Sequence, residues 1–149
     1  AAEALGAIAS SKALPILEKY ARDPTPEVAE TCQLAIGRMK WVKQNTDEEK
    51  NLPENPYSSV DPTPPAASKN VPELQKILLD DSAFLFDRYR AMFALRNLRT
   101  KEAVLALSSA LKVGSALFRH EVAFVLGQMQ DEASVPFLRA SLEDSEENE

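Results

Sequence analysis

The sequence has little of several residue types that particular kinds of site require. It contains one cysteine, Cys32, and one histidine, His120, among 149 residues. A single cysteine excludes an intramolecular disulfide, and a single histidine cannot by itself hold a metal ion. The chain also lacks an apolar run of transmembrane length and any stretch resembling a signal peptide. We therefore expect a cytoplasmic protein without a membrane partner.

Clustered basic residues are also missing. Lysine and arginine are scattered along the chain, and the formal net charge is −6 at pH 7. Binding to nucleic acid draws on clustered Lys and Arg side chains that neutralise phosphates, so no direct nucleic-acid partner is expected. An acidic chain suits a basic or cationic partner better. Apolar residues make up 44% of the sequence, which at this length is enough for one substantial core.

No segment alternates polar and apolar residues as a half-buried strand does, and helical periodicity dominates instead. Thr25 and Pro26 form a helix start signal, with Thr25 as the N-cap and Pro26 at the first helical position. We predict an all-α fold. We expect the chain to begin with the end of a helix, up to about residue 9. Further helices are expected at residues 12–21, 26–43, 71–79, 84–98, 101–112, 115–129 and 132–142.

Similar units recur along the chain. Leu5-Gly6 matches Leu126-Gly127 at an offset of 121 residues, and the same offset places Pro15 on Pro136. The segment around Gly37 lies 31 residues after the one around Gly6. The segment around Leu95 lies 31 residues before the one around Leu126. A repeat of this length with two helical segments per unit is typical of a solenoid of helical hairpins, as in HEAT repeats. We predict such an alpha-alpha superhelix.

One connection is long. Residues 45–70 contain five prolines and little apolar content, which forbids a continuous helix. We predict an extended linker here between two repeat blocks, at residues 1–44 and 71–149. A PxxP-type ligand is the alternative interpretation, although such compositions are more often connectors. Apolar residues that could pin the linker to the blocks are Leu52, Tyr57 and Val60.

Glycine occupies one repeat position inside three helical segments, at Gly6, Gly37 and Gly127. Glycine in a helix interior costs roughly 1 kcal/mol relative to alanine, so a compensating contact is expected. Close approach of the paired helix would supply it. At the equivalent position of the remaining repeat stands Arg96, which predicts looser packing there.

The stretch Ser115 to Met129 carries the only histidine, with Glu121 directly after it. On a helical wheel His120 lies opposite an apolar stripe formed by Phe118, Val122, Val125, Leu126 and Met129, so the histidine should face outward. An ordinary surface histidine is the default interpretation. Shifting the His120-Glu121 position by the repeat spacing gives Tyr89-Arg90 and Glu30-Thr31, which are not ligand pairs. The other equivalent positions fall beyond the two ends of the chain.

The segments FRHEVAFVLGQMQDEASVPFL, AAEALGAIASSKALPIL, EVAETCQLAIGRMKW, YSSVDPTPP and RYRAMFALRN together resemble the deoxyhypusine hydroxylase family of HEAT-repeat di-iron monooxygenases. The resemblance covers essentially the whole chain. In that family four His-Glu pairs face a central cleft and hold two irons. By resemblance His120 and Glu121 are one such pair and hence metal ligands, with no further catalytic residue in this chain.

The resemblance implies the substrate as well: a deoxyhypusine residue in a translation initiation factor of the 5A type, hydroxylated to hypusine with O2. The chain starts without Met inside a helical pattern, so we expect the central portion of a longer enzyme. Because it holds one pair of four, we expect it to bind iron weakly or not at all, and to be inactive alone. Apolar helix faces at its ends could promote self-association.

The alternative is a HEAT-repeat scaffold without enzymatic activity that binds a protein partner. Its groove would be lined by Glu30, Tyr89, His120 and Phe124. Iron content separates the two interpretations, because only the enzyme needs His120 as a ligand.

Overall fold

The computed structural model describes residues 1–45, 52 and 55–147, and this part of the chain is helical without a β-strand. The predicted all-α fold is confirmed. Short 3-10 turns precede α2 and α8 and follow α6. The helices are α1 (Ala2–Ile8), α2 (Leu14–Tyr20), α3 (Pro26–Gln44), α4 (Val71–Leu79), α5 (Leu85–Leu98), α6 (Lys101–Ser109), α7 (Ala116–Met129) and α8 (Val135–Leu142). No helix in the described residues is long and apolar enough to cross a membrane.

Side-chain caps mark where several helices begin. The side chains of Asn70, Thr100 and Ser115 accept a hydrogen bond from a backbone N–H in the first turn of α4, α6 and α7. Such caps satisfy donors that have no partner inside the helix. Thr25 does stand at the N-cap of α3 with Pro26 after it, but its side chain makes no capping bond. Its backbone N–H donates to the Asp23 carboxylate instead, at 2.9 Å.

The first three helices form a small block of their own. α1 and α2 pack on one side of α3, around a core that includes Leu17, Cys32 and Met39. At Gly6, a Cβ atom would lie 2.9 Å from the Cα of Ala35. The predicted close approach of the paired helix is therefore confirmed at this glycine.

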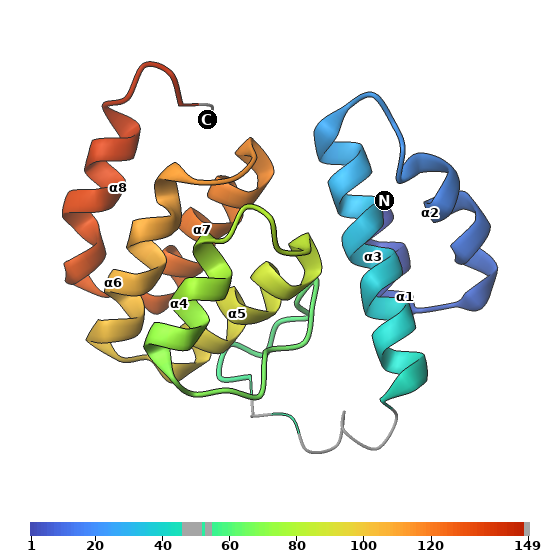
Figure 1. Ribbon diagram of the computed structural model, residues 1–149, viewed down its shortest axis with the longest axis horizontal. Coiled ribbons are helices and arrows are strands. Elements are labelled where there is room, and N and C mark those ends of the chain that lie inside the picture. The colour runs from blue at the N-terminus through green and yellow to red at the C-terminus, as the bar shows by residue number, and fades with distance from the viewer. Residues whose placement is uncertain (46–51, 53–54, 148–149) are drawn as a thin grey trace.

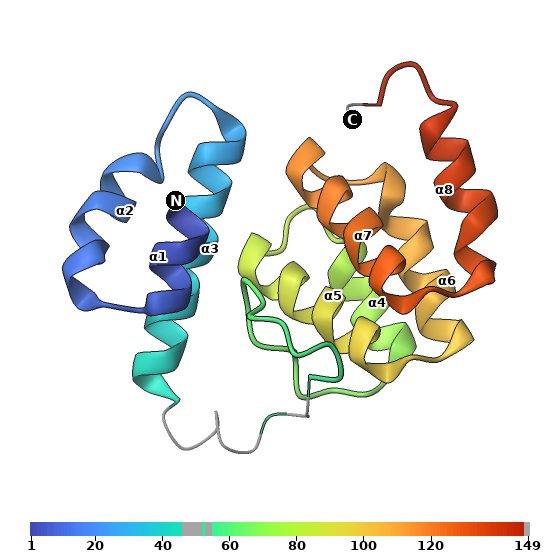
Figure 2. The ribbon, with the colours of Figure 1, turned by 180° about the vertical axis from the view of Figure 1, so that it is seen from behind.

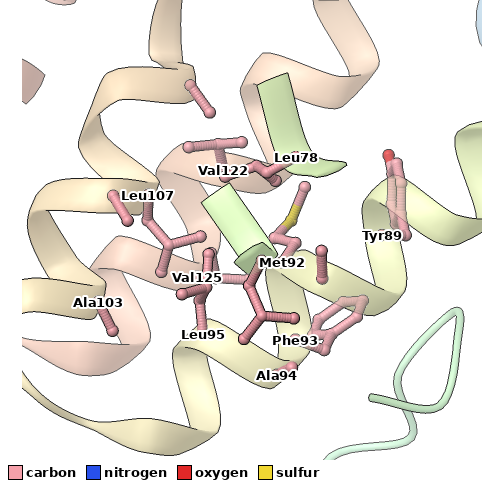
Figure 3. Packing of buried hydrophobic residues seen from close by; sticks show 14 of the residues in the cluster. Leu78, Tyr89, Met92, Phe93, Ala94, Leu95, Ala103, Leu107, Val122 and Val125 are labelled. Atoms are coloured by element: carbon pink, nitrogen blue, oxygen red, sulfur yellow. The ribbon is translucent and has the colours of Figure 1, made fainter. Parts of the chain in front are cut away.

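The second block is built around α5. Residues on every side of α5 are buried, because α4, α6, α7 and α3 all pack against it. Its Met92, Phe93 and Leu95 join Leu107 of α6 and Val125 of α7 in the main hydrophobic cluster (Figure 3). A helix surrounded in this way is a rigid platform for its neighbours.

α3 lies between α1 and α2 on one side and the second block on the other, as both views of the ribbon show (Figures 1 and 2). Its Leu34 belongs to the main cluster, and Gly37 leaves room for the Phe86 ring of α5, which a Cβ atom would meet at 2.6 Å. The Ser115 hydroxyl, at the start of α7, donates to the Glu30 carboxylate of α3 at 2.6 Å. The start of α7 is thus tied directly to the first block.

The described part of the proline-rich segment from residue 55 onward lies against the second block, mainly along α5. Part of the predicted linker, residues 46–51 and 53–54, is outside the described residues. Thr63 is fully buried, and the Ala66 N–H donates to the Arg90 carbonyl at 3.0 Å. Tyr57 does pack on α5, where its ring lies against the Arg96 guanidinium. Val60 is 66% exposed, so the prediction that Val60 anchors the segment was wrong.

Arg96 contradicts the prediction of loose packing. Its side chain is fully buried and pairs with Asp61 of the segment at 2.6 Å. At the position where other repeats carry glycine, α5 carries a long cation that holds the segment. The repeat position did mark a place of close contact, but the element that contacts α5 there is the proline-rich segment and not a helix.

Gly127 differs from Gly6 although both occupy the same repeat position. Nothing lies within 4 Å of a Cβ atom built at Gly127, and the residue is exposed. The prediction of a close helix at every such glycine is therefore wrong for Gly127 in this chain.

This contrast gives a paired stability test. Gly6→Ala should lower the free energy of unfolding by about 1–3 kcal/mol, because the new methyl group collides with α3. Gly127→Ala should raise it by about 0.5–1 kcal/mol, because alanine is the better helix former and has free space there. Urea unfolding of both variants measures the difference. Stabilisation of the chain by Gly6→Ala would contradict the close packing of α1 on α3.

Candidate functional site

Helix α7 presents its two predicted site residues away from the core. Phe118, Val122, Val125 and Leu126 are buried, and Met129 is partly buried against the same cluster, so the predicted apolar stripe is confirmed. His120 is exposed, as predicted, and Glu121 is partly buried. Since successive residues of a helix diverge by about 100°, the two side chains face different surroundings.

Glu121 lines a pocket of about 320 Å³ between the two blocks. Its walls come from α1, α3, the segment at residues 60–62, Tyr89 of α5, and Leu117 and Glu121 of α7. Segments far apart in the sequence therefore build this pocket together. Pockets of this size at a junction between structural units are common places for small ligands to bind.

The surroundings of Glu121 in this pocket disfavour the ionised form of its carboxyl group. Burial raises the pKa of the Glu121 carboxyl to about 7, and the nearby Glu3 and Asp61 carboxylates add to the rise while Arg96 opposes it. No hydrogen bond or ion pair joins Glu121 to another of the described residues. A carboxylate held in this way favours any cation that enters the pocket.

Tyr89 is the second polar group at this pocket. The side chain is 1% exposed, and its ring packs edge-on against Phe118 with the centroids 5.7 Å apart. Figure 3 shows the Tyr89 oxygen directed away from Phe93 and the packed cluster. Burial, with the nearby Glu121 and Glu30 carboxylates, raises the pKa of the Tyr89 hydroxyl far above its ordinary value. Tyr89 therefore remains a neutral hydrogen-bonding group.

His120 lies in a separate hollow of about 250 Å³ between α7 and α8. Leu138 and Leu142 of α8 line it, together with Arg119 and the acidic residues that follow α8. Arg119 is held there by an ion pair with Glu147, at 2.6 Å. The structure thus places the two predicted ligands on one helix but does not bring them into one pocket.

The described residues do not contain a complete metal site. Within them, no three His, Cys, Asp or Glu side chains are grouped so that they could hold a metal ion. His120 and the unpaired Glu121 are donor types that suit non-haem iron. The described residues therefore fit an iron site only in part. The two suitable donors face different pockets, and the other ligands would have to come from elsewhere.

The groove predicted for a scaffold is not formed by its four residues. Tyr89 is buried, the Glu30 carboxylate accepts a hydrogen bond from Ser115, and Phe124 is 54% exposed. The pocket that does form includes Asp61 and Glu3, which sequence reasoning did not single out. Their proximity to Glu121 results from the path of the segment and the packing of α1, neither of which the repeat pattern reveals.

The raised pKa of Glu121 predicts a pH-dependent stability. Between about pH 4.5 and 7 the folded chain binds more protons at Glu121 than the unfolded chain, so this group lowers stability as the pH rises. Glu121→Gln removes the effect. The variant should match the wild type near pH 5 and exceed its free energy of unfolding by on the order of 1–3 kcal/mol at about pH 8.

Urea unfolding at the two pH values checks this prediction. Glu18→Gln, on the exposed surface of α2, is the control for the change in net charge. A wild type that is more stable than Glu121→Gln at the higher pH would show that the carboxylate has a cationic partner in the chain.

Comparison with known proteins agrees with this architecture. The HEAT repeats family model matches residues 71–149, and the PBS lyase HEAT-like repeat model matches residues 1–23. The first match covers more than half of the chain. The helical-hairpin solenoid predicted from the repeat spacing is confirmed.

Similar curated proteins carry the name deoxyhypusine hydroxylase. The chain is 60% identical to the protein of Danio rerio over 149 residues, covering 99% of this chain and 49% of that protein. The Drosophila melanogaster protein is 59% identical, with 100% and 49% covered, and the Homo sapiens protein 55%, with 99% and 48% covered. The chain thus spans about half the length of these relatives.

A solved structure, of human deoxyhypusine hydroxylase in complex with glycerol, matches with a TM-score of 0.91 and 55% identity. The match covers 99% of this chain and 50% of the human chain. The resemblance stated from the sequence is therefore confirmed. The chain belongs to the HEAT-repeat family and is similar, over essentially its whole length, to about half of a deoxyhypusine hydroxylase.

Proposed function

We propose that this chain forms about half of a deoxyhypusine hydroxylase, which hydroxylates a deoxyhypusine residue in a cytoplasmic translation initiation factor of the 5A type. The observation that supports this most strongly is the 55–60% identity to proteins of that name along the entire chain, linker included. The described helices also reproduce the fold of the matching half at a TM-score of 0.91.

The unpaired pocket carboxylate supports the same proposal. Deoxyhypusine carries a side chain with amine charges, and Glu121 offers a carboxylate without a cationic partner among the described residues. Glu3 and Asp61 make the pocket acidic as well. An acidic, partly enclosed pocket attracts and orients a cationic chain, because the charges are screened less there than in open water.

We further propose that His120 and Glu121 are ligands of a di-iron centre. Iron, when bound, supplies the O2 activation that side chains alone cannot perform. His120 would offer an imidazole nitrogen from the exposed side of α7, and Glu121 a carboxylate oxygen from the pocket. Both stand on a helix whose opposite face is fixed in the core, so their positions vary little.

The chain alone should hold iron weakly or not at all. Glu121 lies in the pocket between the blocks and His120 in the hollow between α7 and α8, and a single donor does not retain iron against water. Stable binding would require further ligands from other parts of a protein of the relatives' full length. The remaining ligands are not among the described residues.

Iron content tests the ligand assignment. In a protein of the relatives' full length that contains this chain, His120→Ala should lower the iron bound per protein severalfold. Even loss of a group that only hydrogen-bonds to a metal ligand typically costs about 10–100-fold in metal affinity or activity, and His120 is proposed as a ligand itself. Elemental analysis after purification measures it. Glu102→Ala, an exposed acidic residue at the start of α6, is the control.

Two results would correct the proposal in different ways. Unchanged iron in His120→Ala would remove His120 from the ligand set. Unchanged iron in Glu121→Gln, together with lost hydroxylation, would make Glu121 a residue that binds the substrate amine instead of the metal. If the wild-type protein holds no iron and hydroxylates nothing, the enzyme proposal fails and a protein-binding scaffold remains.

A further inference from the structure

Arg96 has an unusual set of partners for a buried arginine. It stands near the end of α5 with its side chain fully buried. Its Nη1 donates to Asp61 Oδ1 at 2.9 Å, and its Nη2 donates to Asp61 Oδ2 at 2.6 Å. Two parallel bonds of this kind fix both the distance and the orientation of the carboxylate.

The remaining contacts of Arg96 extend the same connection. Nη2 also donates to Asn55 Oδ1 at 3.2 Å, and Nη1 donates to Gln128 Oε1 of α7 at 3.0 Å. The guanidinium carbon lies 4.9 Å from the centre of the Tyr57 ring. Nη1 also donates to Ser59 Oγ at 3.5 Å. Arg96 therefore joins four residues of the proline-rich segment, Asn55, Tyr57, Ser59 and Asp61, to helices α5 and α7.

Asp61 carries the connection on to the first block. While its side chain pairs with Arg96, its backbone carbonyl accepts a hydrogen bond from Arg38 Nη1 of α3 at 3.2 Å. Val60, Asp61 and Pro62 at the same time form one wall of the pocket that contains Glu121. Both blocks and the pocket wall thus meet at one residue.

We propose that Arg96 is a positioning residue that clamps the segment at residues 55–62 between the two blocks, and so sets the shape of the Glu121 pocket. The helices alone leave this wall of the pocket open. Without Arg96, Asp61 would be a partly buried carboxylate without its cationic partner, which favours release of the segment into water. The inference goes beyond the proposed activity, because its readouts need neither metal nor substrate.

Arg88 provides a matched control on the same helix. It is also a buried arginine of α5, but its bonds stay within the second block, to the Leu78 carbonyl at 3.0 Å and to Asp81 at 2.9 Å. Replacing either arginine by methionine removes a buried charge from α5. Only the Arg96 change removes contacts with the segment.

Two readouts report on the clamp. The Ala66 N–H, bonded to the Arg90 carbonyl, reports by hydrogen exchange whether the segment stays on α5. Trp41, the only tryptophan, lies at the end of α3 with the Arg90 guanidinium carbon 5.7 Å from its ring, so its emission reports how α3 meets α5. Neither group contacts Arg96 or Arg88 in the interactions described above.

Arg96→Met should speed exchange at Ala66 by about tenfold or more and shift Trp41 emission to the red, because local opening becomes easier. Arg88→Met should change exchange at Ala66 less than about twofold under the same conditions. Arg96→Lys keeps the charge but loses the two-point contact, so it should restore part of the protection. Asp61→Asn is the milder variant that carries the test if Arg96→Met does not fold, and it should show the same changes at smaller size.

Equal effects of the Arg88 and Arg96 variants at Ala66 and Trp41 would overturn the proposal, since Arg96 would then be an ordinary core residue. Unchanged exchange at Ala66 in Arg96→Met, or in Asp61→Asn where the first variant is unfolded, would overturn it as well.

Discussion

The buried pair of Arg96 and Asp61 is the interaction on which the arrangement of this chain most depends. A guanidinium that is fully removed from water is costly unless its donors are used, and here Asp61, Asn55, Gln128 and Asn97 use them. The pair joins a proline-rich segment, which cannot form a helix, to the most enclosed helix of the fold. Through the Asp61 carbonyl it reaches Arg38 of α3. The placement of one block on the other therefore relies on polar contacts as well as on the packing of α3 against α5.

The site follows from this placement. Helix α7 is fixed by its buried apolar stripe and by the bond from Ser115 to Glu30. Since successive helix residues diverge by about 100°, His120 and Glu121 leave this helix in two directions. Glu121 enters a pocket that exists only because α1, α3 and the segment lie opposite α7. Burial and neighbouring carboxylates then raise its pKa to about 7, which makes the pocket receptive to a cation. His120 faces α8 instead.

Much of the fold could be predicted from the sequence because local signals agreed with one another. Helix boundaries such as Pro26 and Ser115, the outward direction of His120, and the close approach of a helix at Gly6 follow from capping, periodicity and the repeat spacing. Arg96, Val60 and Gly127 were misjudged, since each depends on which neighbour occupies a repeat position, and periodicity does not specify that. The two residues that add to the acidity of the Glu121 pocket escaped prediction for the same reason. Asp61 and Glu3 reach Glu121 only through the tertiary path of the chain.

Mass spectrometry of the acceptor protein tests the central claim most directly. A protein of the relatives' full length that contains this chain would be incubated with iron, O2, a reductant that supplies two electrons per turnover, and an acceptor bearing deoxyhypusine. The account predicts that the deoxyhypusine residue gains one oxygen atom, and that Glu121→Gln and His120→Ala greatly reduce this gain while Glu18→Gln does not. An acceptor that stays unmodified with the wild-type, iron-loaded protein would contradict the enzyme assignment. Full activity in both α7 variants would contradict the assignment of the site.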